Sequence, residues 1–102
     1  MEIKYKRSGA TLYIYVYGDL DEFYANSARE VIDNIILDNL TAGRIVFDLS
    51  GVTFIDSTGI GLLIGRYKKI KSYDISCFIS GASVATEKVL VLSGIYSIMP
   101  KF

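Results

Sequence analysis

Chemistry is concentrated in a short run of small and polar residues, Asp56-Ser57-Thr58-Gly59. The run follows a β-branched apolar stretch, residues 44–49, and opens a helical pattern. Asp, Ser and Thr are preferred at helix starts, because their side-chain oxygens accept hydrogen bonds from amides that have no partner there. A serine hydroxyl at such a place is accessible, and the partial positive charge of the helix start tolerates a phosphate. The run therefore indicates either a simple helix cap or a phosphorylation site at Ser57.

Glycines recur inside the helix that this run opens, at Gly59, Gly61 and Gly65. Each costs about 0.8–1 kcal/mol of helix stability relative to alanine. Their presence indicates that another backbone approaches the helix closely. That backbone belongs either to the sheet of the same domain or to a protein partner docked at the helix start.

Enzyme motifs are not matched. The dinucleotide fingerprint G-x-G-x-x-G fails after Gly59 and Gly61, because Ile64 stands where the third glycine belongs. A phosphate-cradling P-loop is also missing, and with no histidine in the sequence Ser57 has no imidazole base to activate it. We therefore expect a binding protein rather than an enzyme, with no cofactor.

The composition predicts one folded domain, residues 1–102, because 51% of the residues are hydrophobic and the chain is short. Eleven basic residues balance eleven acidic ones, which disfavours a nucleic-acid partner. The alternating start Met1 to Lys6 has no signal-peptide pattern, and no apolar run is long enough to span a membrane. We expect a cytoplasmic monomer with no membrane partner.

The elements that position Ser57 can be read from hydrophobic periodicity. Alternation predicts a β-hairpin that ends near Val16, and Asp21 is the expected N-cap of a helix that buries Ala28, Val31, Ile32, Ile35 and Ile36 on one face. Next come a strand at 44–49, a loop to 56 and a helix from 57. They are followed by a strand at 75–79 and by a helix at 83–92, with Gly94 beyond its end. A short edge segment is expected within 95–102. Helical crossovers place successive strands parallel. The order β-β-α-β-α-β-α predicts an α/β domain with a mixed sheet.

Four carboxylates flank the ends of neighbouring strands and can converge on a Mg²⁺ ion: Asp19, Asp21, Asp48 and Asp56. Such carboxylates more often shape loops and cap helices, so we expect no metal site. Cys77 lies in an apolar strand pattern, which predicts a buried, unreactive thiol.

Two surface patterns leave alternatives open. Tyr13, Tyr15 and Tyr17 share one sheet face, which is either half covered or a platform for stacking RNA bases. A basic cluster late in the second helix is either a solvated helix end or a docking surface for an acidic partner: Arg66, Lys68, Lys69 and Lys71.

The stretch Asp56-Ser57-Thr58-Gly59-Ile60-Gly61 after Val46-Phe47-Asp48-Leu49-Ser50 resembles the signature of the sulphate-transporter and anti-sigma-antagonist (STAS) domain. The continuation from Leu62 to Lys71 is similar to that of antagonists of the sporulation anti-sigma F factor. Gly18-Asp19-Leu20-Asp21 and Leu92-Ser93-Gly94-Ile95 match other segments of the family, so the resemblance covers essentially the whole chain. Thr58 departs from it, since a second serine is common there.

The resemblance implies a four- to five-stranded mixed sheet with helices mainly on one face, and a phosphorylation-controlled partner switch. The unphosphorylated protein would bind an ATP- or ADP-bound anti-sigma factor that is also a serine kinase, and so release a sigma factor. Phosphorylation of Ser57 would end that binding, and a serine phosphatase would restore it. Expected partner-binding residues are Asp21, Asp56, Ser57, Thr58, Gly59 and Gly61. The alternative is a domain that senses a ligand or nucleotide at the same strand ends.

Overall fold

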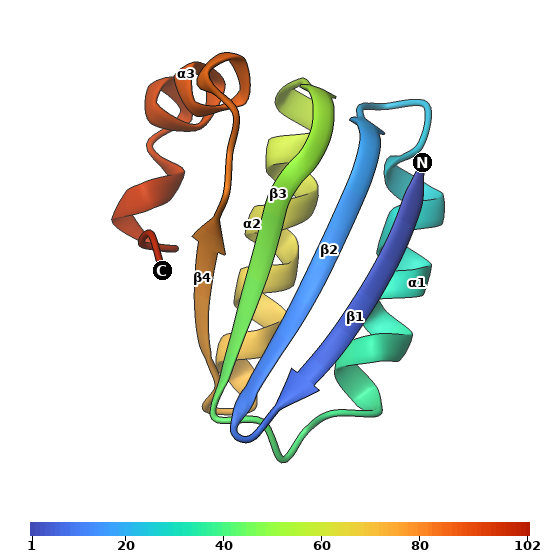
Figure 1. Cartoon of the computed structure of the whole chain (residues 1–102), viewed down its shortest axis with the longest axis vertical. Helices are drawn as coiled ribbons and strands as arrows, with labels where there is room; N and C mark the ends of the chain where they lie inside the picture. Colours follow the sequence, from blue (N-terminus) through green and yellow to red (C-terminus); the bar gives the residue numbers. More distant parts are fainter.

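A four-stranded mixed sheet forms the centre of the computed structural model, which describes all residues from Met1 to Phe102 (Figure 1). The strands lie in chain order: β1 (Glu2–Ser8), β2 (Thr11–Leu20), β3 (Arg44–Ile55) and β4 (Ser76–Ser80). The first two strands form the predicted antiparallel hairpin, and the other neighbours are parallel. The predicted fold class is confirmed.

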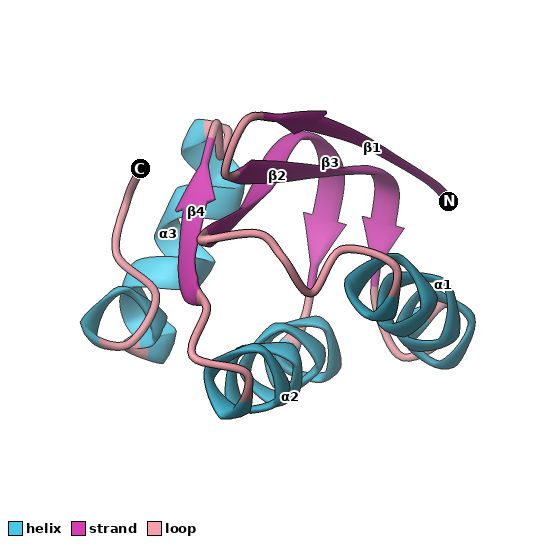
Figure 2. Cartoon of the chain, turned by 90° about the horizontal axis from the view of Figure 1, so that it is seen from below, coloured by secondary structure: helices cyan, strands magenta, loops and turns pink.

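The two long helices, α1 (Ala25–Leu37) and α2 (Ser57–Ser72), lie side by side on the same face of the sheet (Figure 2). A third helix, α3 (Val84–Ser93), lies beyond the end of β4 and beside the last residues of β3. It ends at Gly94, whose φ of 76° is a left-handed conformation that favours glycine. A short 3-10 helix (Ile95–Ser97) follows, and the expected edge segment is a single bridge between Lys101 and Ile79.

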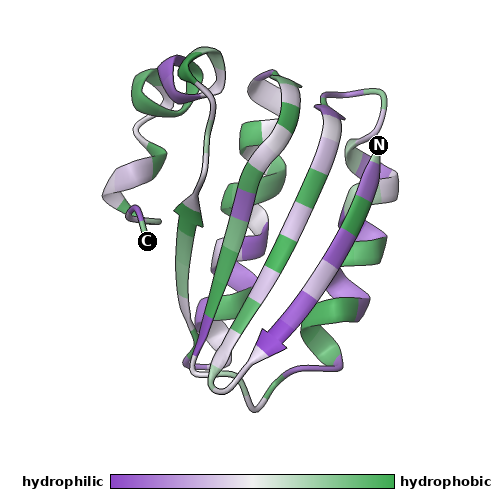
Figure 3. Ribbon diagram, viewed as in Figure 1, coloured by the Kyte–Doolittle hydropathy of each residue, from purple (hydrophilic) through white to green (hydrophobic).

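The core lies between the sheet and the two long helices. Along β2 the alternation works as predicted: Leu12, Ile14 and Val16 are fully buried, whereas the intervening tyrosines turn to the opposite face. Figure 3 shows this alternation as coloured bands along the strand. None of the helices has both the length and the hydropathy that crossing a membrane requires.

Strand β3 is longer than predicted, because it continues to Ile55 rather than ending at Leu49. Its second half stays paired with β2 through two register shifts, and Gly51 lies opposite Tyr17. A Cβ atom at position 51 would collide with the Tyr17 ring, so glycine at this position leaves room for the Tyr17 side chain of the neighbouring strand. The loop expected before Asp56 is therefore strand.

Helix α1 begins later than predicted. The carboxylate of Asp21 accepts hydrogen bonds from the amides of Phe23 and Tyr24, at 3.0 and 3.2 Å, and so closes a turn before the helix instead of capping it. Val31, expected on the buried face, is 42% exposed. On α3, Val84 and Leu92 are also exposed.

Candidate functional site

The start of α2 presents Ser57 to solvent. Ser57 is the first residue of the helix and its side chain is exposed, as predicted. Asp56 is the N-cap: its backbone is extended, and its Oδ1 accepts a hydrogen bond from the Gly59 amide at 2.9 Å. The serine is thus held on a capped helix end, with Thr58 exposed beside it.

Asp56 also fastens the segment between β2 and α1. Its second carboxylate oxygen accepts a hydrogen bond from the Glu22 amide at 3.2 Å, and its own amide donates to the Leu20 carbonyl at 3.4 Å. Because Asp21 lies between those two residues, the structure brings Asp21 and the Ser57 helix start to the same edge of the sheet. This is the arrangement expected for the carboxyl ends of neighbouring parallel strands.

The glycines of α2 divide into two kinds. Gly59 is buried, and a Cβ atom there would collide with the Leu20 carbonyl and lie 2.9 Å from Ile55. Its small size therefore serves packing inside the domain. Gly61 and Gly65 differ, because a Cβ atom at either position would meet nothing within 4 Å. These two leave helix backbone open for an approaching molecule.

Gly61 and Gly65 lie in a groove of about 450 Å³ between α1 and α2. One wall comes from α1 and the turn before it: Glu22, Ala25, Asn26 and Arg29. The other comes from α2: Thr58, Gly61, Leu62, Gly65 and Arg66. The sequence indicated a close backbone approach at Gly65, but it did not assign Glu22 or Arg29 to the site. The available signal was the i, i+3, i+4, i+7 spacing of each wall, which places its residues on one side of a helix but does not show what lies opposite.

The basic cluster of α2 is not simply a solvated helix end. Arg66 Nε lies 3.3 Å from Asp33 Oδ1 on α1, and Lys69 Nζ lies 3.5 Å from the other oxygen. Lys68 and Lys71 are exposed. Burial lowers the pKa of Arg66, and the nearby Arg29 adds to this, while Asp33 opposes it. One carboxylate is therefore shared by two cations at the groove wall.

The four strand-end carboxylates are engaged locally. Asp19 accepts from the Thr53 hydroxyl at 2.7 Å, and Asp48 accepts from the Ser50 hydroxyl at 2.6 Å. Asp21 and Asp56 accept hydrogen bonds from backbone amides. No three acidic, cysteine or histidine side chains come together in a way that could hold a metal ion. Asp21 and Asp56 shape the turn before α1 and cap α2, whereas Asp19 and Asp48 bond hydroxyl groups within strands β2 and β3.

The tyrosine row lies on the sheet face turned away from α1 and α2. Tyr13 and Tyr15 stack with ring centroids 6.2 Å apart, and Phe102 contacts Tyr13 edge-on at 6.1 Å. Lys4 Nζ lies 5.8 Å from the Tyr17 ring centroid. Tyr13 and Tyr15 are half-buried, which agrees with a half-covered sheet face rather than an open platform for RNA bases.

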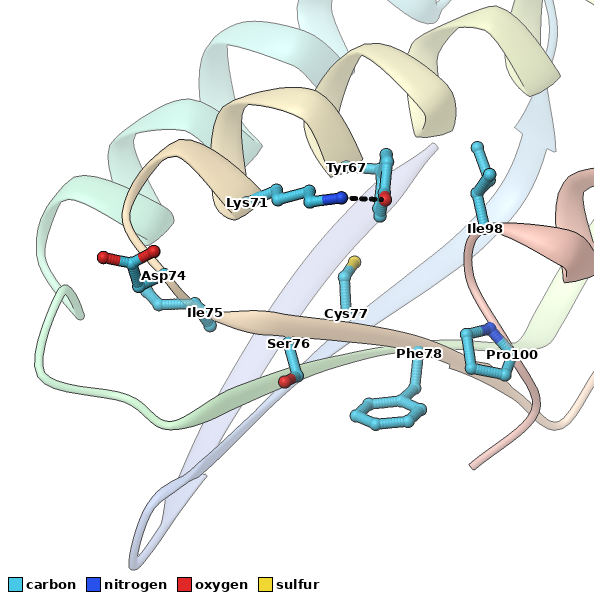
Figure 4. Close-up of a pocket in the computed structure, with 9 residues that line it drawn as sticks. All are labelled: Tyr67, Lys71, Asp74, Ile75, Ser76, Cys77, Phe78, Ile98 and Pro100. Carbon is cyan, nitrogen blue, oxygen red and sulfur yellow. Dashed lines mark hydrogen bonds between the residues drawn. The ribbon is translucent and has the colours of Figure 1, made fainter.

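Cys77 lies beside a second hollow, about 420 Å³ in volume, between β4, the C-terminal half of α2 and the chain end. Figure 4 shows its sulfur pointing toward α2, near the Lys71–Tyr67 hydrogen bond. The thiol is buried, and this burial raises its pKa to about 12. Such a thiol is neutral at physiological pH, as expected for an unreactive cysteine. From α2 the hollow is lined by Tyr67 and Lys71, and Ser57 does not line it.

Comparison with known proteins gives a consistent picture. A sequence model of the STAS domain matches residues 2–102. An anti-sigma F factor antagonist from Paenibacillus polymyxa is 27% identical over 100 residues, which are 98% of this chain and 85% of that protein. An anti-sigma-B factor antagonist from Listeria monocytogenes is 26% identical over 99 residues, covering 97% of this chain and 84% of that protein.

Solved structures share the fold. The anti-sigma factor antagonist SpoIIAA in its unphosphorylated form superposes with a TM-score of 0.78 at 22% identity, covering 99% of this chain and 88% of that one. The phosphorylated form of SpoIIAA, described as a Bacillus cell fate determinant, gives a TM-score of 0.69 at 22% identity, with 99% and 91% of the chains covered.

Proposed function

Because this chain belongs to the STAS domain family, we propose that it is an antagonist of an anti-sigma factor and acts by switching partners. In its unphosphorylated form it binds an anti-sigma factor that is also a serine kinase, loaded with ATP or ADP, and a sigma factor is released. Phosphorylation of Ser57 ends the binding, and a serine phosphatase restores it. The protein acts in the cytoplasm and binds its partner without transforming a substrate. Relatives named as antagonists of anti-sigma F and anti-sigma-B factors support this role.

The observation that carries the proposal is the exposed hydroxyl of Ser57 on a helix start that Asp56 caps. The partner surface comprises Ser57 and Thr58, together with Asp21 and Gly61 at the same edge. Asp56 holds this surface in place by accepting from the Glu22 amide and donating to the Leu20 carbonyl, and Gly59 leaves room for that carbonyl. These contacts favour the bound arrangement before a partner arrives, which lowers the entropic cost of binding.

The switch is electrostatic. A phosphate adds about 1.5 to 2 negative charges at Ser57. With a partner's acidic group about 6 Å away and an effective dielectric constant of about 20, each pair of unit charges costs roughly 2.8 kcal/mol before salt screening. That energy is about a hundredfold in affinity. Because Ser57 is exposed, the phosphate changes the surface and leaves the core in place.

Ligand or nucleotide sensing is the competing proposal. A thermal-shift screen against nucleotides tests it, and a stabilisation by nucleotide alone would favour it.

The direct test of the switch is incubation with the cognate kinase and ATP, followed by mass spectrometry. We expect one phosphate on Ser57, none on the Ser57→Ala variant, and one on Ser57 of the Thr58→Ala variant, even if that variant is modified more slowly. Phosphate on another residue, with Ser57 unmodified, would contradict the proposal. A kinase and a sigma factor encoded beside this protein would identify the partner to use.

A further inference from the structure

We propose that the groove between α1 and α2 receives an acidic side chain of the anti-sigma factor, which pairs with Arg29 and Arg66 while the partner's backbone crosses Gly61 and Gly65. The inference rests on the proposed function, since it names what the partner must carry to fit this surface. It adds a second contact region to the helix start at Ser57, and it gives the chain a means of choosing among anti-sigma factors.

Shape is the first reason. Gly61 and Gly65 are one helical turn apart on the same wall, and a side chain at either position would enter open space. Packing inside the domain therefore does not require glycine there, in contrast to Gly59. Two interior glycines weaken a helix by about 1.6–2 kcal/mol in total relative to alanine. A partner's backbone lying against the helix explains why both positions lack a side chain.

Charge is the second reason. The Arg66 side chain is only 12% exposed; its Nε is ion-paired with Asp33 Oδ1 at 3.3 Å, and its Nη1 is buried without a hydrogen bond. Its one ionic neighbour, Asp33, is shared with Lys69. Arg29 lies close enough to lower the pKa of Arg66 by repulsion, and its Nη2 is 3.3 Å from the uncharged Asn26 side chain. Two cations thus share one carboxylate, and Arg29 lies nearby without an ion pair, so the groove can accommodate another anionic group.

The residues that line the groove favour a carboxylate over other ligand groups. Ala25 and Leu62 are its apolar residues, so an apolar side chain would bury little hydrophobic surface there. Glu22 lies at the groove end nearer Thr58 and repels a long polyanion such as a nucleic acid. Arginine guanidinium groups bind carboxylates with two parallel hydrogen bonds, which supplies both orientation and specificity.

The groove also connects to the switch. Thr58 lines it and is the neighbour of Ser57 in the first turn of α2. A carboxylate bound between the arginines places negative charge on the same helix as the phosphorylated serine. Arg66 lies nine residues after Ser57, roughly 13 Å along the helix axis, so this carboxylate is a second contact and not the acidic group near Ser57 on which the switch depends.

The test is calorimetric titration of the cognate anti-sigma kinase, with ADP, against charge and size variants. We expect Arg29→Glu to weaken binding at least about tenfold, and Arg29→Lys to retain most of the affinity. Lys88→Glu, an exposed charge reversal on α3, is the matched control and should bind like the unmodified protein. For shape, Gly65→Leu should weaken binding strongly, and the smaller Gly65→Ala should weaken it less.

The outcomes separate the two proposals. If the unmodified protein does not bind the kinase, the proposed function fails. If it binds and all groove variants bind equally well, the groove inference is overturned while the function stands. Equal weakening by Arg29→Glu and Lys88→Glu would also overturn it, since it would reveal only general attraction. Melting temperatures exclude unfolding as the cause, because Gly65→Leu fills open space and should melt no lower than the parent.

Two further measurements test which molecule occupies the groove. A photo-crosslinker on Gly65→Cys should capture the kinase, because the native Cys77 is buried and resists labelling; the same crosslinker on Lys88→Cys should not. A titration with inorganic phosphate, followed by amide NMR, tests for a small anion. Phosphate binding that depends on Arg29, without crosslinking at position 65, would replace the docking groove with a small-anion site and overturn the inference.

Discussion

Asp56 accepts a hydrogen bond from the amide of Glu22, which lies 34 residues earlier in the chain, at 3.2 Å. The same carboxylate caps α2 through the Gly59 amide at 2.9 Å. A single side chain therefore holds two segments of the proposed partner surface together. Since each oxygen has its own donor, the two roles can be separated by substitution.

Asp56→Ala should lower the free energy of unfolding by about 1–2 kcal/mol, because it removes the N-cap. Asp56→Asn should cost less, since its amide oxygen still caps the helix, yet it loses the acceptor for Glu22. Urea denaturation measures the first effect. Hydrogen exchange at the Glu22 amide measures the second and should accelerate in both variants. Unchanged exchange in Asp56→Asn would show that the link to Glu22 is unimportant.

The Ser57 series separates charge from shape. Ser57→Ala should bind the kinase about as well as the parent, since it adds no charge. Ser57→Asp should bind more weakly, and the phosphorylated protein should be weakest, by about a hundredfold or more. Ser57→Asn is the control, because it has the shape of Asp without its charge and should bind more tightly than Ser57→Asp. Calorimetry with ADP gives the affinities.

Amide NMR spectra of the same forms test the absence of refolding. We expect shifts near the start of α2 and the β2–α1 segment only. Equal affinity of Ser57→Asp and Ser57→Asn would eliminate charge as the cause. Resonance shifts throughout the sheet would indicate a conformational switch instead.

The glycines of α2 should respond to alanine with opposite signs. Gly59→Ala should destabilise the fold by about 1–3 kcal/mol or more, because the new methyl group meets the Leu20 carbonyl. Gly61→Ala should stabilise it by about 0.5–1 kcal/mol, since the methyl enters open space and the helix propensity rises. Chemical denaturation of the two variants decides this, and destabilisation by both would mean that Gly61 also has a packing role.

Cys77 should react slowly with a thiol reagent in the native protein and rapidly once the protein is unfolded, because burial raises its pKa to about 12. The native state then favours the neutral thiol. The contribution of the buried Cys77 thiol to the free energy of unfolding is complete below the ordinary cysteine pKa near 9, and it is lost as the pH rises toward 12.

At pH 10 this loss is on the order of 1 kcal/mol. Denaturation curves at pH 7 and pH 10 should therefore show a smaller pH effect in Cys77→Ala than in the parent, even though the variant is less stable overall. Identical pH dependence of the two proteins, or fast labelling of the native thiol, would mean that Cys77 is accessible.

The sequence by itself determined the local features. Alternation at Leu12, Ile14 and Val16 produced the correct hairpin strand, because successive side chains of a strand point to opposite faces. The start of α2 at Ser57 was also predicted correctly, since capping depends on bonds within one turn of the chain. The family signature around Ser57 is local in the same sense.

The tertiary structure alone decided features that join distant segments. The extension of β3 to Ile55 depends on pairing with β2, and the need for glycine at position 59 depends on a carbonyl at Leu20. Periodicity placed Val31 on the buried face of α1, but the neighbouring elements leave it exposed. The groove exists only because the wall that contains Arg29 faces the wall that contains Gly65. Such contacts form between residues far apart in sequence. The pattern within one segment does not indicate which other segment packs against it.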